Sequence, residues 1–168
     1  MRRKAARYVI GYGVTVMVAV LLRCVYAEMG GVVLSLLTPI NGSAWEQGKL
    51  CFWPYLAGAL LIWRLGDGTD SRGGHCALML LMPLLLTLSC AALGERAQQL
   101  LPVLWPAVTA LGIALYAWVL RRRLWGGELL WYTLAILLGI AYLLLTAMPP
   151  QTGIFTDPMG LPTVAIPV

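Results

Sequence analysis

Long apolar segments alternate with short polar ones along most of this chain. Each apolar segment is about 20 residues long, which is the length that an α-helix needs to cross the hydrocarbon core of a bilayer. The segments cover about 8–27, 44–65, 76–94, 100–120 and 129–148, and a tail outside the membrane follows at 149–168. The pattern therefore predicts an all-α, polytopic transmembrane helix bundle with five spans. The short connections favour antiparallel neighbours.

The composition agrees with a lipid solvent. Of the 168 residues, 60% are hydrophobic and 11% are charged, whereas a soluble domain carries about 25% charged residues. The length suits one domain, so we take residues 1–168 as a single integral membrane domain. The net charge of +5 does not indicate a nucleic-acid partner, because the basic residues flank apolar spans and form no stripe on a polar face.

Basic residues mark one side of the predicted bundle. If there are five spans, the other side receives Lys49 and Arg96, with Arg23 inside the first span near that face. Cytoplasmic loops carry an excess of Lys and Arg. The bias therefore predicts a cytoplasmic N-terminus, an external C-terminus and a place in the cell (inner) membrane. The nine residues on the N-terminal side are Arg2, Arg3, Lys4, Arg7, Arg64, Arg72, Arg121, Arg122 and Arg123.

An alternative interpretation of the first 27 residues is a cleaved signal peptide. Residues 2–4 would be its basic start, and Ala27 would precede the cleavage site. Arg23 within the apolar run and the bulky Tyr26 beside the cleavage position argue against this interpretation. It would leave the topology of the other spans unchanged.

The residue types that usually bind metals show no metal-binding spacing. Cys24, Cys51, Cys76 and Cys90 form no C-x-x-C pair, and His75 is the single histidine. The sequence also contains neither G-x-S-x-G nor a P-loop. We therefore expect no metal and no cofactor. A disulfide between Cys24 and Cys51, which should lie near the same membrane face, stays open.

Polar residues concentrate between the first two predicted spans. Pro39 ends any preceding helix, and 41–42 (Asn-Gly) favours a turn. The following Ser-Ala-Trp-Glu is a capping box, in which the Ser43 hydroxyl accepts from the N–H of Glu46 and the Glu46 carboxylate reaches back to the N–H of Ser43. The motif predicts a helix that starts at Ala44.

Three residues at the start of the second span share one helical face: Trp45, Lys49 and Trp53. The capping box does not account for them. An aromatic belt at the membrane interface would account for the two tryptophans. Lys49 is therefore kept as a candidate site residue.

Arg23 is a cation inside the first span. A charge within a span is costly and indicates a functional site by default. We expect its guanidinium to point into the bundle and to pair with a carboxylate. Glu46 is the first choice, because the first two spans are neighbours, and Glu28 and Asp157 are the alternatives.

The C-terminal tail is too apolar for a solvated disordered segment. Residues 149–168 hold five of the ten prolines, and Asp157 is their single charge. We expect an irregular segment that lies on the outer mouth of the bundle or on the lipid interface. It would carry Asp157 back over that mouth.

Small residues recur at helical spacing on the last two spans. Such residues let helix backbones approach closely in lipid, so both sets predict packing seams. The fourth span carries Ala107, Ala110, Ala114 and Ala117, and the fifth carries Ala135 and Gly139.

Two motifs resemble those of a family of small bacterial multi-pass membrane proteins of unknown function. One is P-I-N-x-S-x-W-E-x-x-K, which begins at Pro39, and the other is F-x-D-P, which begins at Phe155 after Pro149-Pro150. The order of the spans fits over nearly the whole chain. The resemblance implies a topology and no activity. The chain departs from the family pattern at Gly42, at Gln47 and at Arg23, where family members often carry glutamate, histidine and histidine.

These observations favour a non-catalytic membrane protein that binds a small molecule, lipid or protein partner at its outward mouth. An enzyme that acts on a lipid, with Glu46 or Asp157 as acid or base, is the first alternative. A transporter or channel subunit is the second, although an odd span count excludes two equal inverted repeats. The candidate binding residues are Arg23, Asn41, Ser43, Trp45, Glu46, Lys49 and Asp157.

Overall fold

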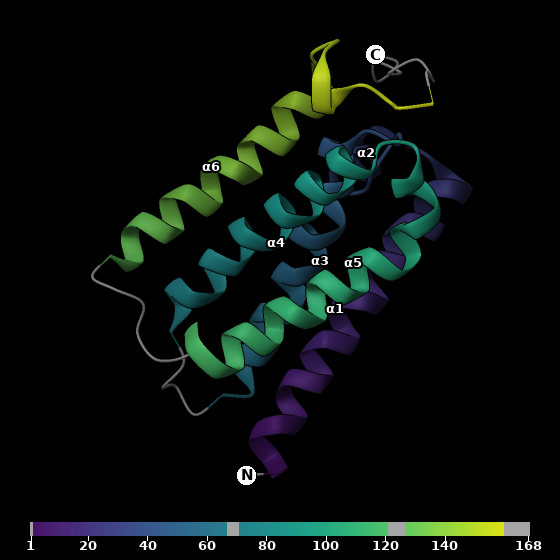
Figure 1. The fold of residues 1–168 in the computed structure, drawn as a ribbon. Coiled ribbons are helices and arrows are strands. Elements are labelled where there is room, and N and C mark those ends of the chain that lie inside the picture. The colour runs from purple at the N-terminus through teal and green to yellow at the C-terminus, as the bar shows by residue number, and fades with distance from the viewer. Residues whose placement is uncertain (1, 67–70, 121–126, 160–168) are drawn as a thin grey trace.

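The computed structural model describes residues 2–66, 71–120 and 127–159 (Figure 1). The described residues form helices and connecting segments, with no strand among them. All five predicted helices are present, with ends within a few residues of those expected except at the start of the first. The helices are α1 (Arg2–Met29), α2 (Val32–Leu37), α3 (Ala44–Arg64), α4 (Arg72–Leu93), α5 (Arg96–Leu115), the π-helical turn η1 (Tyr116–Leu120), α6 (Glu128–Ala147) and the 3₁₀ turn η2 (Gly153–Phe155).

Four of the described helices are long and apolar enough to cross a membrane: α1, α4, α5 with η1, and α6. Helix α3 has 21 residues, which is long enough, but it falls outside this group because its first two turns are polar. The sequence had placed a fifth span here. The structure thus supports an all-helical membrane protein with four such helices.

Helix α3 lies in the centre of the bundle and contacts α1, α4, α5 and α6 (Figure 1). Thirteen of its 21 residues are buried, whereas four of the 20 residues of α6 are. The charged residues at the start of α3 are therefore enclosed by other helices. This central position explains how a helix with polar turns is accommodated among apolar ones.

The two ends of the bundle differ. The first residues of α1 lie at one end, and α2 and η2 lie at the other (Figure 1). We call the second end the capped end; it comprises the last turns of α1 at 23–29, residues 30–49, the α4–α5 connection at 94–98 and the segment 148–159. The end opposite to it contains the last turn of α3 and the first turns of α4 and α6. The candidate site residues from 41 onward all lie at the capped end.

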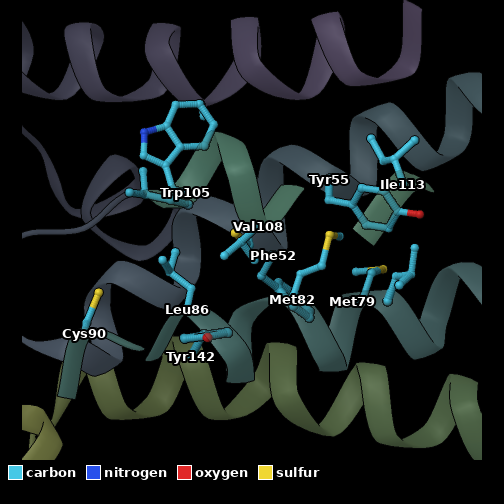
Figure 2. Packing of buried hydrophobic residues seen from close by; sticks show 14 of the residues in the cluster. Phe52, Tyr55, Met79, Met82, Leu86, Cys90, Trp105, Val108, Ile113 and Tyr142 are labelled. Atoms are coloured by element: carbon cyan, nitrogen blue, oxygen red, sulfur yellow. The ribbon is translucent and has the colours of Figure 1, made fainter. Parts of the chain in front are cut away.

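Aromatic, sulfur-containing and branched side chains fill the interior between the helices (Figure 2). Phe52 and Tyr55 of α3 occupy its middle, and Tyr142 contributes from α6. The outward surfaces are also apolar, as Leu84, Leu111 and Ile136 illustrate with 56%, 62% and 63% exposure. An apolar surface of this kind suits contact with lipid, because soluble monomers rarely expose large contiguous apolar patches.

The predicted alanine seam on α5 is wrong. Ala107, Ala110 and Ala114 are exposed and Ala117 is half-buried, because α5 buries other residues, Leu101, Trp105 and Val108 among them. The pair on α6 is confirmed, since Ala135 and Gly139 are buried. A Cβ placed at Gly139 would lie 3.3 Å from the Phe52 ring of α3.

Candidate functional site

Helix α3 begins at Ala44, and its N-terminal cap is the predicted one. The Ser43 hydroxyl accepts a hydrogen bond from the backbone N–H of Glu46 at 3.3 Å. The other predicted hydrogen bond of the capping box, from the N–H of Ser43 to the Glu46 carboxylate, is wrong. The side-chain oxygen of Asn41 accepts from the N–H of Ser43 at 2.9 Å instead, which leaves the Glu46 carboxylate for other donors.

The Glu46 carboxylate is the centre of a buried polar network. Its Oε2 accepts from Lys49 Nζ at 2.7 Å and from the backbone N–H of Ile40 at 3.1 Å. The Thr146 hydroxyl of α6 lies 3.1 Å from Oε1. Lys49 is 0% exposed and also donates to the carbonyl of Ser35 at 3.0 Å. This carbonyl belongs to the last turn of α2, where a cation is favourable.

The loop before α3 is held from three directions. Asp157 Oδ2 accepts from the N–H of Gly42 at 2.7 Å, and Gln98 of α5 donates to the Gly42 carbonyl at 2.8 Å. Gln47 donates to the carbonyl of Asn41 at 2.9 Å. The expectation that the tail carries Asp157 back to this mouth is confirmed for the described part, and residues 160–168 lie outside it. Asp157 therefore fastens the loop.

Trp45 is half-buried against two aromatic residues. Its ring lies 4.6 Å from that of Tyr142 in α6 and 5.3 Å from that of Phe155 in the tail, between centroids. Contacts with α6 and the folded tail therefore account for part of the Trp45 surface, and its place in an interfacial belt stays a prediction. Trp53 lies about two turns further along the same face of α3. It is half-buried with its ring edge-on to Phe52.

The predicted ion pair of Arg23 is also wrong. Arg23 is exposed, and no carboxylate in the described part of the chain pairs with it. Glu46 is taken by Lys49, which lies three residues away on the same helix and needs no tertiary alignment to reach it. Asp157 is engaged with the loop.

Arg23 borders a cleft between α1 and α5 of about 280 Å³. Cys24 stands beside it on α1, and Gln98 is the polar residue that α5 contributes. Figure 2 shows Trp105 of α5 next to α1, where it forms part of the cleft wall. The sequence could not show this cleft, because nothing in it indicates that α1 and α5 are neighbours. The other lining residues are Ala19, Val20, Leu50, Leu101 and Pro102.

No family model, curated protein or solved structure matches this chain. What the capped end can do chemically follows from how its charges are used. Glu46 and Asp157 accept hydrogen bonds that hold the fold, and Lys49 neutralises Glu46 inside the network. Arg23 is the cation at this end that borders a cleft while pairing with no described carboxylate. The arrangement is suited to bind an anionic group.

The cysteines are not bonded to one another. Cys24 is exposed, whereas Cys51 is buried with its sulfur 3.7 Å from the Thr109 hydroxyl. The disulfide between these two residues, which the sequence left open, is absent, because Cys24 borders the cleft between α1 and α5 whereas Cys51 lies inside the bundle. The described residues contain no group of three His, Cys, Asp or Glu side chains that could hold a metal.

Proposed function

We propose that the chain is a five-span protein of the bacterial inner membrane, with α3 as the fifth span and the capped end outward. Two observations support α3 as a span. Its residues from Leu50 to Ile62 are mostly apolar, and its neighbours α1 and α4 are themselves candidate spans. The basic residues Arg7, Arg64 and Arg72 support the orientation, since all lie toward the end opposite the capped end.

Single cysteines test this topology. In a variant without the four native cysteines, Thr152→Cys is expected to react with a membrane-impermeant maleimide added to intact cells, because Thr152 is exposed at the capped end. Leu65→Cys, exposed at the opposite end, is the control and should react only after permeabilisation. The reverse pattern would invert the orientation, and labelling of both from outside would refute the span count.

We further propose that the protein is non-catalytic and binds an anionic amphiphile of the outer leaflet at the Arg23 cleft. The observation that carries this is an exposed guanidinium inside a candidate span that has no described carboxylate partner and borders a mostly apolar cleft. An arginine at the centre of a span costs about 2.5–3.5 kcal/mol on insertion scales, and the cost falls toward the end of the span, where Arg23 lies. An anionic headgroup with its chains along α1 and α5 would lower this cost.

The enzyme alternative draws less support. A general acid or base must reach the reacting atom of a substrate, but both candidate carboxylates are buried and hydrogen-bonded within the protein. Glu46 is 4% exposed and Asp157 is 8% exposed. Each of them already accepts a hydrogen bond from the loop at 40–43.

Loss of the Arg23 charge tests the binding proposal. Arg23→Leu is expected to weaken binding of phosphatidylglycerol by about ten- to hundredfold, because a hydrogen bond to a charged group contributes about 1.5–3 kcal/mol. Arg23→Lys should keep most of the binding. The measurement is lipid retention in native mass spectrometry, with phosphatidylcholine as the neutral comparison.

Arg96→Leu is the matched control, because Arg96 is an exposed cation at the capped end that does not line the cleft. Protection of Cys24 from N-ethylmaleimide provides a second readout, since Cys24 lines the same cleft. If Arg96→Leu weakens binding as much as Arg23→Leu, or if bound lipid leaves Cys24 unprotected, the cleft is not the site.

A further inference from the structure

A second cavity lies at the end of the bundle opposite the capped end, between α3, α4 and α6. Its volume is about 440 Å³, which falls in the range of about 300–1,000 Å³ typical of ligand pockets. Helices α3 and α4 each line it with residues at positions i, i+3, i+4 and i+7, so each turns one continuous face toward it. These residues are Leu56, Ala59, Leu60 and Trp63 of α3, and Arg72, His75, Cys76 and Met79 of α4, with Tyr132 from α6.

His75 lines this cavity with a ring that is held by two tyrosines. The residue is 6% exposed. Its ring stacks on Tyr116 with centroids 3.9 Å apart, and its Nδ1 lies 2.8 Å from the Tyr55 hydroxyl. Its Nε2 is buried and has no hydrogen-bond partner among the described residues. Because Nε2 is fully buried, a ligand in the cavity would contact other atoms of His75.

Arg72 supplies the charge of this cavity. Its guanidinium lies over the Trp63 ring, 4.3 Å from the centroid. This stacking keeps the guanidinium plane fixed, and Tyr132 of α6, which also lines the cavity, interacts with the same guanidinium. None of the described lining residues is acidic. Glu128 lies near Gly73 at the start of α6, but it does not line the cavity.

We propose that this cavity binds a single-chain amphiphile with an anionic oxygen headgroup, of which a long-chain carboxylate is the simplest example. The carboxylate would accept from the guanidinium of Arg72, which is the cation among the described lining residues. The chain would lie along Leu56, Leu60 and Met79. Leu60 is 55% exposed, so this wall is open to the hydrocarbon. The site is separate from the Arg23 cleft.

Oleate is the probe for this proposal. The purified full chain in a non-ionic detergent is expected to retain oleate in native mass spectrometry and to bind methyl oleate and oleylamine at least tenfold more weakly. A diazirine analogue of oleate should cross-link to residues 56–63 or 72–79. Binding of oleylamine equal to that of oleate would overturn the proposal, because the cavity would then recognise only the chain.

Variants separate this site from the outer cleft. Arg72→Gln is expected to weaken oleate binding at least tenfold, whereas Arg64→Gln, an exposed cation at the same end that does not line the cavity, should leave it unchanged. Leu60→Trp should reduce binding by filling the cavity. Cross-links at 19–24 or 98–105 would place oleate in the Arg23 cleft, and would overturn this inference without affecting the proposed function. Unchanged binding in Arg72→Gln would also overturn it.

Discussion

Replacing Lys49 with methionine is expected to destabilise the protein by about 3–5 kcal/mol, because removal of one partner of a buried ion pair leaves an uncompensated charge. The Glu46 carboxylate would keep the N–H of Ile40 and the Thr146 hydroxyl but lose its countercharge at 2.7 Å. The carbonyl of Ser35 would lose its donor as well. The free energy of unfolding in mixed dodecylmaltoside–dodecylsulfate micelles measures the effect.

Two companion variants make this result specific. The double variant Glu46→Gln/Lys49→Met removes both charges and should recover most of the lost stability, since it is the unpaired charge that costs the most. Arg96→Met, an exposed cation at the same end, should change stability by less than about 0.5 kcal/mol. A double variant as unstable as Lys49→Met would show that the methionine, and not the stranded carboxylate, is responsible.

Gly58→Ala is expected to cost about 1–3 kcal/mol by overpacking the contact between α1 and α3. A Cβ at Gly58 would collide with the Thr15 hydroxyl and would lie 2.7 Å from the backbone carbonyl of Gly11. The hydroxyl is itself held by that carbonyl at 2.9 Å, so it cannot move freely. The helices would have to separate, and small residues are what allow close approach in lipid.

Gly13→Ala is the matched control for this second prediction. A Cβ at Gly13 meets nothing within 4 Å, and the residue is exposed on the same helix α1. Alanine also favours a helix over glycine by about 1 kcal/mol, so this variant should be neutral or slightly stabilising. Equal losses in both variants, measured in the same micelle assay, would contradict a close contact at Gly58.

The polar groups of the two ends play different parts. At the capped end, Glu46, Lys49 and Asp157 are buried and hold the loop at 40–43 against the bundle. Arg23 at that end, and Arg72 with His75 at the other, border cavities instead. Polar residues that hold the fold and polar residues that face a cavity are thus separate groups, which is why we assign binding only to the second.

Features that depend on neighbouring residues along the chain could be predicted from the sequence. The length of each apolar segment predicted the helices, because a helix is specified by the residues within it. The start of α3 followed from the Ser43 hydroxyl, since a cap reaches only three residues ahead. The return of the tail followed from its apolar composition, and Asp157 does contact the loop.

Features that depend on which helix faces meet were decided by the tertiary structure alone. Arg23 lost its expected partner because Lys49 is nearer to Glu46. The alanines of α5 face outward, whereas Gly58 forms an unforeseen contact with α1. His75, which the sequence left without a role, lies against Tyr55 and Tyr116 from two other segments. The physical reason is the same in each case: an apolar helix in lipid has no single hydrophobic face to reveal its orientation, so the side chains it turns inward are settled by packing against the other helices.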